Sequence, residues 1–79
     1  MSTVPPTEYV EAERLRPGDK LIYAGLVVEV AARPVTADWR EAGEHVYGVE
    51  IECKDVSGTA RLFLYRPRHH LMERMVRDA

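Results

Sequence analysis

Apolar residues in this 79-residue chain fall mostly into short runs in which polar residues alternate with them, a pattern typical of β-strands. Residues 20–23 and 26–30 are rich in β-branched and aromatic side chains and predict two strands. The Ala24-Gly25 pair between them predicts a tight turn, because glycine readily adopts a positive φ. Just upstream, Arg16-Pro17-Gly18-Asp19 predicts a type II turn, since proline fixes φ at the second position and glycine supplies a positive φ at the third.

The strongest local pattern is a hairpin formed by residues 45–54 and 59–65, with a loop at 55–58 between them. With Lys54 opposite Thr59, three pairs join apolar side chains: Cys53 with Ala60, Ile51 with Leu62, and Val49 with Leu64. Two further pairs are complementary in charge or shape: Glu52 with Arg61, and Gly48 with Tyr65. A shift by one residue would break all of these pairs together, so we expect a well-specified register.

A longer loop is expected between these two strand pairs, at residues 36–44. Asp38 and Glu41 have the D-x-x-E spacing of a capping box, and Gly43 is well placed as a left-handed C-cap. One helical turn inside a projecting loop therefore fits this segment better than a full helix.

The two ends of the chain are less well specified. Residues 1–6 are small and proline-rich and predict a flexible arm, which leaves residues 7–79 as a single domain. Residues 8–15 fit either a strand or a short helix. Residues 71–76 repeat apolar side chains at helical spacing, but a short final strand fits them equally well, and both alternatives stay open.

One stretch of this chain resembles the first residues that recur in SH3-like barrels. It consists of Leu15-Arg16-Pro17-Gly18-Asp19-Lys20-Leu21, followed by Gly25, Val28 and Val30. This stretch is similar to the N-terminal, KOW-type domain of bacterial elongation factor P and its relatives, and the chain follows the order of strands and turns of that domain over roughly residues 9–66. This resemblance implies an all-β fold, a small barrel of about five strands with a projecting loop and a short C-terminal strand or helix. Those factors carry a functional lysine, or sometimes another basic residue, at the tip of the loop after the second strand. Here the loop offers Trp39 and Arg40 and no lysine, so the ribosomal activity is not carried over.

The composition limits the setting of the protein. A single cysteine, Cys53, cannot form an internal disulfide and predicts a reducing cytoplasm. The first residues lack the pattern of a signal peptide, and no apolar run approaches the roughly 20 residues of a membrane span, so no membrane partner is expected. Arginine far outnumbers lysine, and asparagine and glutamine are absent, which is typical of a high-GC bacterial or phage genome.

The charge is unevenly distributed along the chain. The net charge of −2 argues against strong nucleic-acid binding by the chain as a whole. Residues 1–53 hold five basic and ten acidic residues, a balance of −5, whereas residues 54–79 hold six basic and three acidic residues, a balance of +3. This asymmetry fits either a basic patch near the C-terminus or a set of cross-strand salt bridges.

No catalytic residue, cofactor or metal site is predicted, and the protein is expected not to be an enzyme. The sequence has no glycine-rich phosphate loop, no G-x-S-x-G motif and no plausible Cys–His pair. Cys53 and His45 lie eight residues apart on one expected strand, about 26 Å, which is too far for a shared metal. Cys53 is instead expected in the core, and His69 and His70 in an exposed loop.

Two kinds of partner remain. Alternation places Arg61, Phe63 and Tyr65 on one face, and with Arg66, Arg68 and Arg74 they predict a surface for RNA or DNA. The opposing interpretation places the two aromatic rings under the C-terminal segment and pairs Arg61 with Glu50 and Glu52.

The second hypothesis is a protein-interaction module. It uses Trp39 and Arg40 in the projecting loop, or an exposed strand edge. Trp39 folded back onto the end of the barrel is the opposing interpretation for this residue. The chain is expected to be a monomer or a homodimer, with apolar residues of the C-terminal segment as a possible dimer contact.

Overall fold

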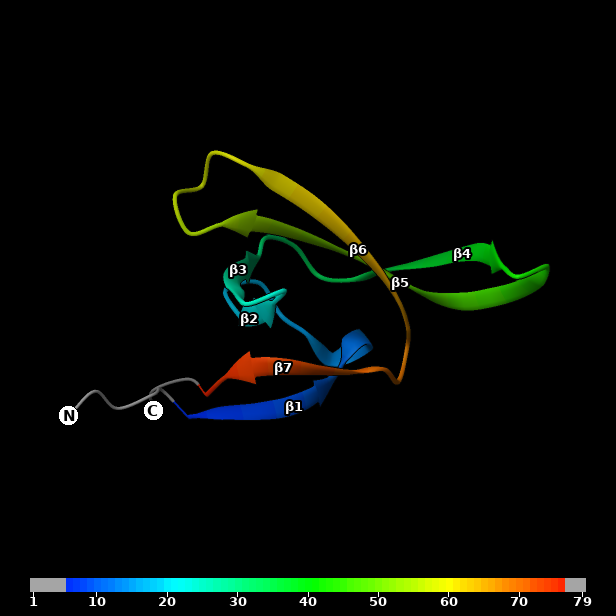
Figure 1. Cartoon of the computed structure of the whole chain (residues 1–79), viewed down its shortest axis with the longest axis horizontal. Coiled ribbons are helices and arrows are strands. Elements are labelled where there is room, and N and C mark those ends of the chain that lie inside the picture. The colour runs from blue at the N-terminus through cyan, green and yellow to red at the C-terminus, as the bar shows by residue number, and fades with distance from the viewer. Residues whose placement is uncertain (1–5, 77–79) are drawn as a thin grey trace.

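The computed structural model describes residues 6–76, which form seven β-strands and one turn of 3-10 helix (Figure 1). In chain order the elements are β1 (Thr7–Glu11), η1 (Ala12–Arg14), β2 (Lys20–Tyr23), β3 (Leu26–Val30), β4 (Val35–Glu41), β5 (Glu44–Asp55), β6 (Arg61–Pro67) and β7 (Leu71–Met75). The prediction of an all-β protein is confirmed. The sheet has seven strands rather than about five, and across residues 6–76 its strands do not pair into a closed barrel.

All strand pairs are antiparallel, and the sheet follows the order β1-β7-β2-β3-β5-β4. The long strand β5 organises one half of it. Its C-terminal end pairs with β3 and its N-terminal half with β4, while β6 pairs with it over residues 48–54. Figure 1 shows the result as a folded-over sheet, with β5 and β6 above, β1 and β7 below, and β2 and β3 between them.

The core fills the space between these two layers. Its members come from alternate strand positions and from η1 and the residue after it: Ala12, Leu15, Leu21, Val28, Val30, Val49, Ile51, Cys53, Leu64 and Met72. The prediction that Cys53 is a core residue is confirmed, since its side chain is fully buried. Leu26, at the start of β3, lies outside this core and is 68% exposed.

Two Ala-Gly pairs make the tightest turns. Ala24-Gly25 and Ala42-Gly43 each have a positive φ at both residues, which is the backbone of a type I′ turn. The first was predicted as a tight turn. The second shows that the expected loop with a helical turn at 36–44 is wrong. The alternation along β4 and its pairing with β5 prevail over the D-x-x-E spacing, which is a purely local signal.

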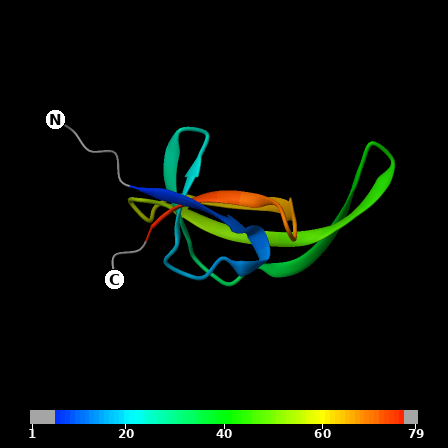
Figure 2. The same cartoon turned by 90° about the horizontal axis from the view of Figure 1, so that it is seen from below.

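The β4–β5 hairpin extends well beyond the rest of the molecule (Figure 2). A projecting element was therefore predicted at the right place in the chain, but it is a two-stranded ribbon rather than a loop. The hairpin carries several side chains that the sequence placed on irregular backbone, Trp39 and Arg40 among them.

The β5–β6 hairpin was predicted, but its register is shifted by two residues. Lys54 lies opposite Arg61 rather than Thr59, and Glu50 lies opposite Tyr65. The cause is a wider loop, in which the Asp55 carboxylate accepts hydrogen bonds from the backbone N–H groups of Thr59 (3.0 Å) and Ala60 (3.3 Å). A shift of two residues keeps every side chain on its predicted face, because side chains alternate with a period of two.

The turn before β2 is built as predicted. The Asp19 N–H donates to the Arg16 carbonyl (3.0 Å), and Gly18 has φ of 93°. Asp19 is 1% exposed, and its carboxylate accepts from the Arg16 N–H (2.8 Å) and lies 3.3 Å from Arg74 Nη1.

The open alternatives at the two ends are settled as strands. The segment at 8–15 forms the greater part of β1 followed by η1, and residues 71–75 form β7, which pairs with β1 and, at Leu21, with β2. The predicted flexible arm, apart from Pro6, lies outside the described residues.

Candidate functional site

Three aromatic side chains lie on the outer face of the β4–β5–β6 sheet. Trp39 comes from β4, and Phe63 and Tyr65 come from β6. The rings of Trp39 and Tyr65 are 6.0 Å apart and meet edge to face at 68°. Together with the valines on the same face these residues form what we call the aromatic face: Val35, Trp39, Val46, Phe63 and Tyr65.

Much of this apolar surface is open to solvent. Phe63 is 51% exposed, Tyr65 46% and Val35 54%, whereas Trp39 is half-buried. The alternation along β6 was predicted to put Phe63 and Tyr65 on one face with Arg61, and it does. The opposing interpretation, in which the C-terminal segment covers both rings, is wrong because that segment pairs with β1 and β2 instead.

A glycine makes the contact between the two outer strands possible. Gly48 lies in β5 between β4 and β6, and a Cβ atom there would meet Trp39 Cη2 at 2.6 Å and the Arg66 carbonyl oxygen at 2.2 Å. The indole therefore occupies the space above the glycine and reaches the Tyr65 ring. Its N–H donates to the Glu41 carboxylate at 3.1 Å, which fixes the ring plane.

Carboxylates border the aromatic face. The Tyr65 hydroxyl donates to Glu50 (2.8 Å), and this hydrogen bond raises the pKa of Tyr65. Glu52 forms an ion pair with Arg61, which confirms the expected pairing of Arg61 with an acid although the two residues are diagonal rather than opposite. With Glu41, three carboxylates thus lie beside the rings, and the guanidinium of Arg61 is already paired with one of them.

The six residues predicted to contact nucleic acid are not all brought onto one surface, although Arg61, Phe63 and Tyr65 share a face of β6. Arg66 alternates to the opposite face of β6 from Tyr65, and its guanidinium donates to the Tyr65 carbonyl (2.8 Å). Arg68 is exposed in the turn after β6. Arg74 is on β7, where Glu8 and the buried Asp19 engage its guanidinium and raise its pKa.

The two residues predicted to contact a protein partner, Trp39 and Arg40, are also separated. They are neighbours in β4, so their side chains point to opposite faces of the hairpin. The Arg40 guanidinium donates to the Gly43 carbonyl at 3.3 Å and so closes the turn. On that opposite face His45 lies 3.2 Å from Asp38 and stacks on Tyr47 with ring centres 4.4 Å apart.

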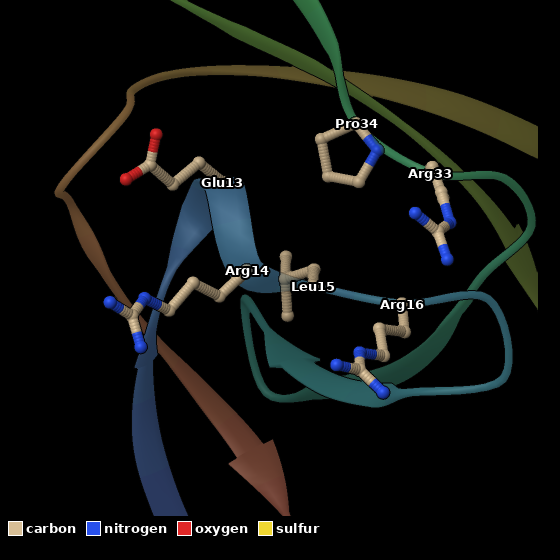
Figure 3. Close-up of a pocket in the computed structure, with 6 residues that line it drawn as sticks. All are labelled: Glu13, Arg14, Leu15, Arg16, Arg33 and Pro34. Carbon is tan, nitrogen blue, oxygen red and sulfur yellow. The ribbon is translucent and has the colours of Figure 1, made fainter.

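A basic pocket of about 410 Å³ was not predicted (Figure 3). It is lined by residues of η1, the turn that follows it and the β3–β4 connection: Glu13, Arg14, Leu15, Arg16, Arg33 and Pro34. We call it the arginine pocket. Nothing in the sequence joins residue 33 to residues 13–16, because only the folded sheet brings the two segments together.

Cys53 and His69 are engaged in structural contacts. Burial, with a smaller effect of the Glu52 charge, raises the pKa of the Cys53 thiol to about 11, so the thiol is protonated near neutral pH. His69, exposed as predicted, forms ion pairs with Glu11 and with Glu13 (3.4 Å). The hydrogen bond from His69 lowers the pKa of Glu11.

Comparisons of the chain with known protein families, with curated proteins and with solved structures found no match. No helix among residues 6–76 is long and apolar enough to cross a membrane. The fold and the exposed side chains define the protein as a small all-β domain with an aromatic surface on one face of its sheet.

Proposed function

We propose that this domain is a non-enzymatic binding module whose aromatic face takes an extended, apolar and basic segment of a protein partner. The row formed by the exposed Phe63 and Tyr65 and the half-buried Trp39 carries this proposal. Aromatic side chains are enriched where protein partners bind, because each buries a large apolar area at little cost in side-chain entropy. A contiguous row of them left open on a small domain is typical of an interaction site.

The charge around the row favours a protein partner over nucleic acid. A strand of RNA or DNA whose bases stacked on Phe63 and Tyr65 would bring its phosphates near Glu50 and Glu52. Arg61 lies on the same face of β6 as these rings, and Glu52 already neutralises it. Lysine or arginine side chains of a partner would instead complement the carboxylates that border the face.

The proposed fold family is the SH3-like barrel. Its support is the order of elements that the resemblance predicts: a Gly-Asp turn, two short strands, a projecting element and a long hairpin. The folded-over antiparallel sheet is compatible with that family. The function proposed here rests on the aromatic face and does not depend on this assignment.

The experiment is a selection of short peptides by the immobilised domain, followed by measurement of the dissociation constants of the enriched peptides. We expect enriched sequences that combine apolar residues with lysine or arginine. Phe63→Ser should weaken their binding by about 5- to 30-fold, which corresponds to about 1–2 kcal/mol. Tyr9→Ser is the matched control, because Tyr9 is also a solvent-exposed aromatic residue (68%) but lies on β1, away from the aromatic face.

A single-stranded RNA of mixed sequence serves as the competing probe at about 50 and 200 mM salt. RNA binding that weakens with salt and with Arg66→Ala and Arg68→Ala, with no peptide enriched, would overturn the proposal and restore the nucleic-acid hypothesis. Enriched peptides that bind the Phe63→Ser and Tyr9→Ser variants equally well would show that another surface is used.

A further inference from the structure

The arginine pocket is held by well-defined backbone. Leu15, which is 2% exposed, lines it, and in Figure 3 the side chains of Arg16 and Arg33 lie to the right of Leu15 whereas that of Arg14 extends to the left, away from them. The turn that carries Arg16 is fastened to the end of β3 by the hydrogen bonds between Gly18 and Val30 (2.9 Å) and between Val30 and Asp19 (2.8 Å).

The β3–β4 connection, which forms the other side of the pocket, is also held by a backbone hydrogen bond. The Ala31 N–H donates to the Glu52 carbonyl at 2.8 Å, so the β3–β4 connection that carries Arg33 leaves the sheet from a fixed point. Across η1, the Glu13 N–H donates to the Arg68 carbonyl at 3.0 Å. The backbone positions of all three arginines are therefore set by the fold rather than by a free loop.

The pocket holds an excess of positive charge. Its lining residues include three arginines and one acidic residue, Glu13, whose carboxylate already lies 3.4 Å from His69. Arg14 has only a long contact of 4.0 Å with Glu11. Within residues 6–76, no carboxylate forms an ion pair with the side chain of Arg16 or Arg33. Such an excess is notable in a chain whose net charge is −2.

We propose that the arginine pocket binds a phosphate group. Guanidinium groups match phosphate oxygens in geometry and can donate two parallel hydrogen bonds to them, and they keep their charge at any physiological pH. A phosphate dianion would balance the two positive charges that the lining carries in excess. The group could belong to a small phosphomonoester or to the backbone of a nucleic-acid strand, and both offer the same oxygens to the arginines.

The pocket shares no residue with the aromatic face, so phosphate binding here does not depend on the proposed function. It also differs from the nucleic-acid surface predicted from the sequence, which consisted of residues of β6, the following turn and β7. Arg14, Arg16 and Arg33 were not among them.

The test is an NMR titration of the ¹⁵N-labelled domain at constant ionic strength, following backbone amides and arginine Nε–H groups. The probes are inorganic phosphate, adenosine monophosphate, and a single-stranded oligonucleotide without terminal phosphates. Chloride at matched ionic strength is the blank. We expect saturable shifts at residues 13–16 and 33, and a loss of affinity of about tenfold in Arg16→Gln and in Arg33→Gln. Arg40→Gln, which removes the same charge from the tip of the β4–β5 hairpin, should bind as the unmodified domain does.

Each outcome has a defined meaning. Tighter binding of the monophosphate than of the oligonucleotide supports the pocket with a small phosphomonoester as its ligand, and the reverse order supports it with a nucleic-acid strand. Absence of saturable shifts with every probe would overturn the proposal. Equal weakening by Arg40→Gln and Arg16→Gln would also overturn it, because only the net charge would then matter.

Discussion

Replacing Gly48 by alanine tests the packing of the aromatic face at its tightest point. An added Cβ would lie 2.2 Å from the Arg66 carbonyl oxygen and 2.6 Å from Trp39 Cη2. Close carbon–oxygen contacts in sheets are about 3.3 Å or longer, so β5 and β6 would have to separate by about 1 Å. Because the nearest atom belongs to the backbone, no rotamer change relieves the clash. Overpacking of this kind costs about 2 kcal/mol.

For a domain of this size that cost corresponds to a decrease in Tm of about 8–16 °C. The assay is thermal unfolding followed by circular dichroism and by the fluorescence of Trp39, the single tryptophan. The indole emission should also shift, since the new methyl group displaces the ring. Gly58→Ala is the control, because Gly58 has φ of 76° and open space around it, so alanine there adds backbone strain without a clash. If Gly48→Ala leaves both Tm and emission unchanged, the pairing of Gly48 with Pro67 and the position of Trp39 are wrong.

Three further predictions concern the core and the loops. Arg74→Met removes the guanidinium that lies against the buried Asp19 and should lower the free energy of unfolding in urea by about 3 kcal/mol. Arg68 is exposed, so the control Arg68→Met should change this free energy by less than about 0.5 kcal/mol. Cys53 should resist thiol reagents in the folded protein at pH 8, and rapid labelling of the native protein would contradict its burial. Because folding raises the pKa of the thiol to about 11, the free energy of unfolding that Cys53 contributes should be lost as the pH rises from about 9 to 11. Backbone hydrogen bonds, that of Ala60 foremost, lower the pKa of Asp55, so Asp55→Ala should lower Tm at neutral pH. This difference in Tm should vanish as the pH falls through the lowered pKa. A difference in Tm that does not depend on pH would show that the carboxylate is not the cause.

Much of the sheet could be predicted from local patterns. The turns at residues 16–19 and 24–25 and the two strands that they flank follow from proline, glycine and β-branched residues alone. The register of the β5–β6 hairpin could not, because the pattern of faces repeats every two residues and tolerates a shift of two. What selects the true register is the side chain of Asp55, which holds a wider loop than the sequence indicates.

The β4–β5 hairpin was missed for a different reason. Asp38 and Glu41 give a local helical signal, whereas the strand depends on β5, which is long enough to pair with β3 at one end and with β4 at the other. That pairing is non-local, and it overrides the local preference.

The same distinction applies to the two candidate sites. Alternation along β6 correctly placed Phe63 and Tyr65 on one face, but it left open whether the C-terminal segment covers them. Trp39 joins them only through the pairing of β4 with β5, and the arginine pocket forms only when the β3–β4 connection packs near η1. Both contacts depend on tertiary structure and leave no trace in the local sequence.

The most direct test of the central claim is to map where a selected peptide touches the domain. Backbone amide shifts of the ¹⁵N-labelled protein would be recorded at increasing peptide concentration, with the indole N–H of Trp39 as an additional reporter. If the aromatic face binds the peptide, the largest changes will cluster at its residues, Val35, Trp39, Val46, Phe63 and Tyr65. Changes confined to β1, or to the exposed apolar residues around Leu26, would contradict that claim.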